Sequence, residues 1–164
     1  YIDMGDVSSD DTKTFNIINI WTSQAAQEKT VFEKKGYLVR SDVGVLDKEI
    51  RTHLGDPDTH GYIFIGHGAS GATINSFSHL GEDRTGVEYD RYSEHGLAFL
   101  TLRACYSADK TKGIGKHRYR YNPWESNVAT RGRFVGYEGW VTTYNEVFQW
   151  VSAPGKNDYP YSVK

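Results

Sequence analysis

Apolar and polar residues alternate in blocks along the chain, and the apolar blocks have the lengths of single strands and amphipathic helices. Short apolar runs predict strands at Phe15–Trp21, Tyr37–Val43, Tyr62–Gly66, Leu97–Ala104 and Arg133–Gly139. Helical spacing and stop residues predict helices at Ser23–Gly36, Val45–Gly55 and Thr142–Val151. Strands that alternate with helices favour an α/β fold, in which helices cover both faces of a mainly parallel sheet.

The predicted elements form one domain between residues 15 and 153, and 164 residues are enough to bury a real core. Residues 1–14 are acidic and polar and do not resemble a signal peptide, so we expect a tail, a linker or the cut end of a longer protein. Residues 154–164 are expected to form a second tail. Two long polar connections separate the later strands, and the first of them, Ala69–Gly96, is expected to hold a hairpin or loop.

Composition excludes several classes of partner. The formal net charge is −2, which provides no overall field to attract nucleic acid or an anionic membrane. No apolar run is long enough to cross a bilayer. The six histidines are scattered without an HExxH pair, and the single cysteine cannot build a CxxC zinc site. The sequence therefore predicts no metal site and no cofactor, and it indicates no cellular compartment.

Two residues with reactive side chains directly follow predicted strands. The apolar run from Tyr62 ends in Gly66-His67-Gly68, and the run from Leu97 ends in Ala104-Cys105. In parallel α/β sheets, functional groups gather beyond the carboxyl ends of the strands. If these two strands are neighbours, His67 and Cys105 share one edge of the sheet.

Other interpretations of the glycine-histidine segment are less consistent with the sequence. Its glycine spacing matches a phosphate-binding loop, but Ala72 stands where such a loop needs lysine. The segment also looks like the oxyanion loop of lipases, but the chain has no G-x-S-x-G nucleophile motif. Taken singly, a buried cysteine and a histidine in a turn are both ordinary structural features.

Taken together, "YIFIGHG" and "LAFLTLRACYS" resemble the caspase-like cysteine peptidases, the superfamily of caspases, metacaspases, legumains, gingipains, clostripains, CHAT-type proteases and clostridial toxin self-cleavage domains. The resemblance extends over roughly Phe15 to Val151 as an order of elements. It implies a three-layer α-β-α sandwich with a mainly parallel sheet. It also implies a cysteine endopeptidase that acts on a protein or peptide substrate.

The same resemblance implies a role for four residues. His67 and Cys105 would form the catalytic dyad, and the backbone N–H groups of Gly68 and Cys105 would form the oxyanion hole. Arg103 occupies the position that lines the P1 pocket in this superfamily, so a preference for Asp or Glu at P1 is implied. The alternative for Arg103 is an ion pair with a carboxylate of the protein itself.

Regulation and competing functions stay open. Acidic P1 specificity would permit self-cleavage at Asp83, Asp90 or Asp109, within a larger effector or toxin. The basic stretch Lys110–Arg133 could bind an anionic activator, or it could be a solvated substrate-contacting loop. The alternatives to a peptidase are a catalytically inactive caspase-like binding module and a hydrolase or transferase that acts on a non-peptide acyl group.

Overall fold

A computed structural model describes residues 1–5, 12–69, 73–75, 86–88, 90–108, 111–112, 117–118 and 123–137. Its helices are α1 (Thr12–Lys34), α2 (Asp47–Gly55) and the 3-10 helix η1 (Pro123–Asn127). Its longer strands are β3 (Gly61–Ile65), β6 (Leu97–Arg103) and β9 (Val128–Val135). The short strands are β1 (Ile2–Met4), β2 (Ser41–Val43), β4 (His67–Ala69), β5 (Thr73–Asn75), β7 (Thr111–Lys112) and β8 (His117–Arg118).

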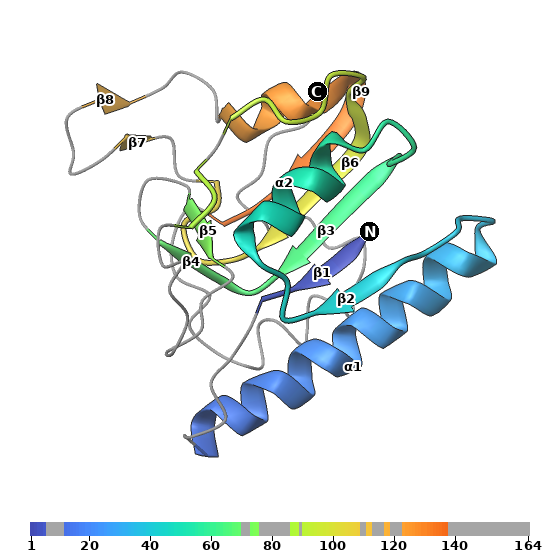
Figure 1. Ribbon diagram of the computed structural model, residues 1–164, viewed down its shortest axis with the longest axis vertical. Coiled ribbons are helices and arrows are strands. Elements are labelled where there is room, and N and C mark those ends of the chain that lie inside the picture. The colour runs from blue at the N-terminus through green and yellow to red at the C-terminus, as the bar shows by residue number, and fades with distance from the viewer. Residues whose placement is uncertain are drawn as a thin grey trace.

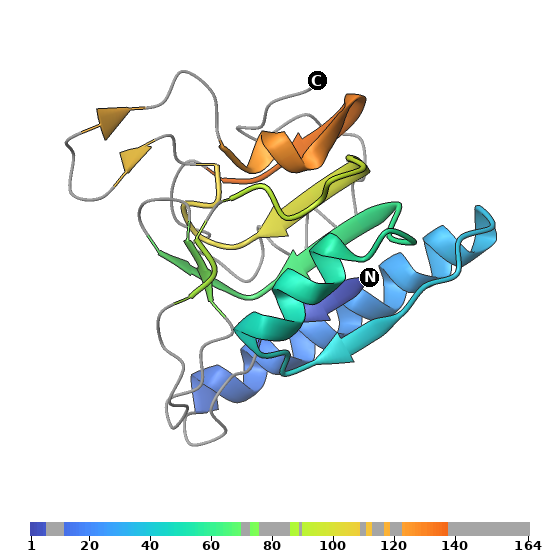
Figure 2. The same ribbon diagram turned by 45° about the horizontal axis from the view of Figure 1, so that its top comes forward.

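The described part of the chain is a three-layer α/β sandwich, as the sequence predicts. Its five-stranded sheet has the order β2-β1-β3-β6-β9, and all neighbouring strands in it run parallel. Helix α1 covers one face of the sheet, and α2 covers the other (Figures 1 and 2). This arrangement is consistent with a caspase-like sandwich.

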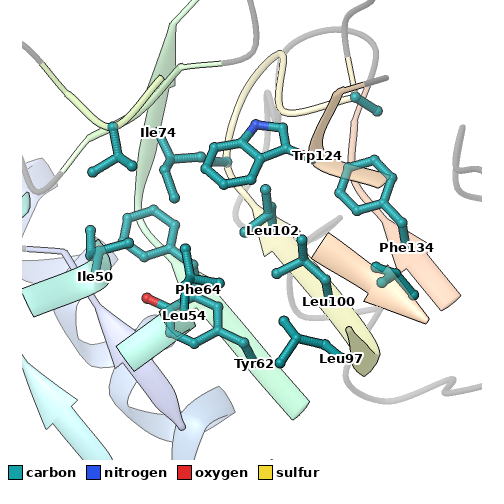
Figure 3. Packing of buried hydrophobic residues seen from close by; sticks show 14 of the residues in the cluster. Ile50, Leu54, Tyr62, Phe64, Ile74, Leu97, Leu100, Leu102, Trp124 and Phe134 are labelled. Carbon is teal, nitrogen blue, oxygen red and sulfur yellow. The ribbon is translucent and has the colours of Figure 1, made fainter. Parts of the chain in front are cut away.

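The alternation of side chains along the strands divides the core between the two faces. Tyr62 and Phe64 of β3 point to the α2 face, where they pack with Ile50 and Leu54 of α2 (Figure 3). The same cluster continues across the sheet through Leu97, Leu100, Leu102, Trp124 and Phe134. On the opposite face, α1 packs Trp21 and Ala25 against Ile2, Met4, Ile63 and Ile65.

The expectation that residues 1–14 form a tail is wrong at residues 2–4. These residues form β1, which lies inside the sheet between β2 and β3. The strand has only three residues, and its middle residue is Asp3, so no apolar run announces it. Burial of Asp3 is possible because His53 and the Tyr62 hydroxyl both contact its carboxylate.

The prediction of a strand at Phe15–Trp21 is also wrong, because this segment belongs to α1. A short apolar run rich in isoleucine does not distinguish a strand from a buried turn of helix. The spacing of the residues from Trp21 onwards distinguishes a helix from a strand. Trp21, Gln24 and Ala25 are buried at helical intervals, and Glu28 lies one turn further on, in contact with the sheet.

The remaining predicted elements divide into confirmed, adjusted and undescribed segments. Helix α2 and strands β3 and β6 are confirmed within one or two residues of the predicted bounds. The predicted strand Tyr37–Val43 shortens to β2, and the predicted strand Arg133–Gly139 begins earlier, as β9 at Val128. Strands β4 and β5 form a hairpin at the start of the first long connection. The predicted helix Thr142–Val151 and the tail 154–164 lie outside the described residues.

Within the described part of the chain, no helix combines the length and the apolar character that crossing a bilayer requires.

Candidate active site

His67 stands where the chain leaves the main sheet. Strand β3 ends at Ile65, and the N–H of Gly66 still donates a hydrogen bond of 3.2 Å to the carbonyl of Arg103 in β6. A Cβ atom at Gly66 would lie 2.5 Å from the Phe64 ring, so glycine lets the chain turn tightly over that ring. His67 then begins β4, partly exposed to solvent.

The side chain of His67 lies on the α1 face of the sheet. Its ring meets the Trp21 ring of α1 edge-on, with 5.4 Å between the centroids and an interplanar angle of 72°. Ile63 and Ile65 point to the same face, so His67 continues the alternation of β3. Trp21 thus limits the orientations that the imidazole can adopt.

Cys105 stands at the equivalent place after β6, in a tight turn. The N–H of Ser107 donates to the carbonyl of Ala104 at 3.3 Å, and the Ser107 hydroxyl donates to the carbonyl of Leu102 at 2.8 Å. The same hydroxyl accepts a hydrogen bond of 3.1 Å from the N–H of Tyr137, just beyond β9. Buried Ser107 therefore links the turn that carries Cys105 to β6 and to the segment just after β9.

The residue after the cysteine has an unusual backbone conformation. Tyr106 has a φ of 59°, in the left-handed region that bulky residues seldom enter. Conformations of this kind persist only where the surroundings enforce them, and they concentrate at functional sites. In this turn the hydrogen bonds of Ser107 supply that constraint. The Cys105 residue itself is partly exposed.

Strand pairing brings the two sequence-predicted residues to one edge of the sheet. Strands β3 and β6 are adjacent and parallel, and the last residues of their ladder, Ile65 and Arg103, pair in register. His67 and Cys105 each follow two residues later along the chain. Both therefore lie beyond the carboxyl ends of neighbouring strands, where parallel sheets place their functional groups.

Gly68 is in direct backbone contact with Cys105. A Cβ atom at position 68 would lie 2.1 Å from the carbonyl oxygen of Cys105, 2.9 Å from its nitrogen and 3.0 Å from the Cβ of Ala104. Only glycine allows the two segments to come this close. The resemblance implies that the backbone N–H groups of Gly68 and Cys105 are the oxyanion donors. These two groups thus belong to backbone segments that are in direct contact.

Arg103 is buried against α1, and its contacts bear on the pocket role that the resemblance implies. Its residue is 3% exposed, and its guanidinium forms an ion pair with Glu28 and a 3.3 Å hydrogen bond to the Gln24 amide oxygen. Both partners belong to α1. The ion pair inside the protein, which was the alternative interpretation, is thus present, and the preference for an acidic P1 residue stays an untested prediction.

Sequence reasoning missed Trp21 and Ser107, which support the two candidate catalytic residues. A helix assigned from Thr12 would have shown that Trp21, Gln24 and Glu28 share one face.

The candidate activator site is described only in part. Strands β7 and β8 pair as a hairpin, while residues 109–110, 113–116 and 119–122 lie outside the described residues.

The functional proposal rests on the sequence and the geometry of the site alone, because comparisons with known proteins gave no match. No family model matches the chain, and no similar protein was found among curated proteins or solved structures.

Proposed function

We propose that the chain is a caspase-like cysteine endopeptidase in which His67 and Cys105 form the catalytic dyad. The observation that carries the proposal is the parallel, in-register pairing of β3 with β6, because it ends with the two residues at the same edge of the sheet. Two further observations support it. Glycine at position 68 touches the Cys105 backbone, and Tyr106 adopts a left-handed conformation beside the nucleophile.

The first half of the proposed reaction forms an acyl-enzyme. The Cys105 thiolate attacks the scissile carbonyl carbon, so that a carbon–sulfur bond forms and negative charge moves to the oxygen. The N–H groups of Gly68 and Cys105 donate hydrogen bonds to that oxygen. His67 donates a proton to the leaving nitrogen as the carbon–nitrogen bond breaks, and the amine product departs.

The second half releases the acid product. His67, now neutral, accepts a proton from a water molecule as the water oxygen attacks the thioester carbon. The carbon–sulfur bond breaks, and the sulfur leaves as thiolate. The carboxylic acid product leaves, and the dyad returns to its starting state. Trp21 keeps the imidazole on the correct face of the sheet through both halves.

The proposal carries no P1 preference, because Arg103 is engaged by α1. Self-cleavage within a larger effector or toxin stays a prediction without a preferred residue. Of the three aspartates named as sites, Asp90 is described and exposed, whereas Asp83 and Asp109 lie outside the described residues. An anionic activator at the basic stretch likewise stays a prediction.

A positional library of fluorogenic peptides, assayed with the wild-type chain and with Cys105→Ala, tests the proposal. We expect turnover of at least one library by the wild-type chain and none by Cys105→Ala, since the thiolate cannot be replaced by a methyl group. Mass spectrometry during turnover should show one acyl group on Cys105. Turnover that is equal in both chains would contradict the proposal.

Parallel assays separate the two alternative functions. An inactive binding module would turn over neither peptides nor activated esters. A hydrolase or transferase for non-peptide acyl groups would process activated esters through Cys105 and leave every peptide library intact. Either pattern, obtained with folded protein, would replace the peptidase proposal.

A further inference from the structure

A second cluster, of two carboxylates and one imidazole, lies on the opposite face of the sheet from His67. Asp3 is the middle residue of β1, and Asp42 is its in-register partner on β2. His53 reaches the pair from α2, which covers this face (Figure 1). One oxygen of each carboxylate and one ring nitrogen of His53 all lie within 4.8 Å of one another.

The buried member of this cluster lacks a hydrogen bond at one atom. Asp3 is fully buried, and its Oδ2 lies 2.7 Å from Nδ1 of His53 and accepts a 2.8 Å hydrogen bond from the Tyr62 hydroxyl. Its Oδ1 is also buried and has no hydrogen-bond partner. A buried carboxylate oxygen without a donor is costly, so native proteins usually provide a donor or a cation at such a place.

Burial has the largest effect on the Asp3 carboxyl group. Burial raises the pKa of Asp3, the contacts with His53 and Tyr62 lower it, and the nearby Asp42 carboxylate, the smallest cause, raises it.

We propose that Asp3, Asp42 and His53 bind one divalent transition-metal ion, with Zn²⁺ as the best match to the donor set. An imidazole nitrogen with two carboxylate oxygens suits zinc, whereas Mg²⁺ and Ca²⁺ prefer oxygen ligands alone. The three protein ligands leave a fourth position for water. This site goes beyond the proposed peptidase activity and does not depend on it.

The surroundings of the cluster meet the other requirements of a metal site. Asp42 is exposed, so an ion has a path from solvent to the buried Asp3. The Tyr62 hydroxyl holds the Asp3 carboxylate, and the Tyr1 ring stacks on His53 with centroids 4.0 Å apart. Such outer contacts orient metal ligands. The ion would link β1, β2 and α2.

The test is a Zn²⁺ titration of the full chain carrying Cys105→Ala, because the thiol and His67 could bind zinc on their own. Competition with a chromophoric chelator should show saturable binding of one Zn²⁺ per chain, and Mg²⁺ or Ca²⁺ in large excess should not displace it. Asp42→Asn and His53→Gln should each weaken the binding about tenfold or more, which is a usual loss for a removed contact at a metal.

Matched variants and a spectroscopic reading make the result decisive. Asp58→Asn and His60→Gln change exposed residues outside the cluster and should leave the affinity unchanged. Co²⁺ bound in place of Zn²⁺ should give visible absorption that disappears in His53→Gln. Absence of one-to-one binding, or binding that both Asp42→Asn and His53→Gln leave unchanged, would overturn the proposal. Loss in Asp42→Asn alone, with equal Ca²⁺ binding, would overturn the assignment of His53.

Discussion

Ile65 and Arg103 are in-register partners at the last step of the parallel ladder between β3 and β6. This pairing matters because a turn follows immediately after each of the two strands. His67 follows the first strand and Cys105 the second, so one pairing register determines where both candidate catalytic residues lie. Gly68 then packs against the Cys105 backbone and closes the space between the two turns.

Replacing Gly68 by alanine should remove most of the peptidase activity. The added Cβ would lie 2.1 Å from the Cys105 carbonyl oxygen, so the two backbone segments must separate. Loss of oxyanion geometry on that scale should lower kcat by about 10²–10³-fold. Gly55→Ala in α2 is the control, because its Cβ would meet only the Tyr92 carbonyl, at 3.3 Å. Equal kcat in both variants would remove Gly68 from the oxyanion hole.

Replacing Trp21 should affect His67 through its orientation. Trp21→Phe keeps an aromatic ring against the imidazole, whereas Trp21→Ala opens a space beside it. We expect Trp21→Ala to lower kcat about tenfold or more, because catalytic groups must be held in a narrow range of geometry. Trp21→Phe should retain most of the activity. Comparable kcat for both variants, measured in folded protein, would show that the ring contact does not position the histidine.

Ser107 should stabilise the turn that carries Cys105. Its buried hydroxyl donates to Leu102 and accepts from Tyr137, so Ser107→Ala leaves two backbone groups without this partner. The expected cost is about 1–3 kcal/mol in the free energy of unfolding, measured by urea denaturation. Ser41→Ala, at an exposed position of β2, should change the unfolding free energy by less than about 0.5 kcal/mol. Equal values for the two variants would contradict this role.

Arg103 should contribute to stability and not to substrate choice. Glu28→Ala removes a partner from a guanidinium that lies buried under α1, and removing one member of a buried pair typically costs about 3–5 kcal/mol. The double variant Arg103→Met with Glu28→Leu should recover much of that loss, because no buried charge remains. A change in P1 preference in the double variant, with stability unaltered, would return Arg103 to the substrate pocket.

The sequence was sufficient to predict the elements whose patterns are local. Strands β3 and β6 are apolar runs that end at a glycine-rich turn or at a small residue, and their ends predicted the positions of His67 and Cys105. Strand β1 was missed because Asp3 interrupts it, and its burial depends on His53, 50 residues away. The role of Arg103 depended on a helix whose start was misassigned, since Gln24 and Glu28 lie 79 and 75 residues from it.

The most direct test of the central claim uses the fact that Cys105 is the only cysteine in the chain. Alkylation by iodoacetamide at neutral pH therefore reports on one sulfur atom, and mass spectrometry gives its rate. If His67 activates Cys105, His67→Ala should slow the alkylation about tenfold or more, because the thiolate is the reacting species. His60→Ala, which changes an exposed histidine, should react at the wild-type rate. Equal rates for the wild-type chain, His67→Ala and His60→Ala would contradict the dyad.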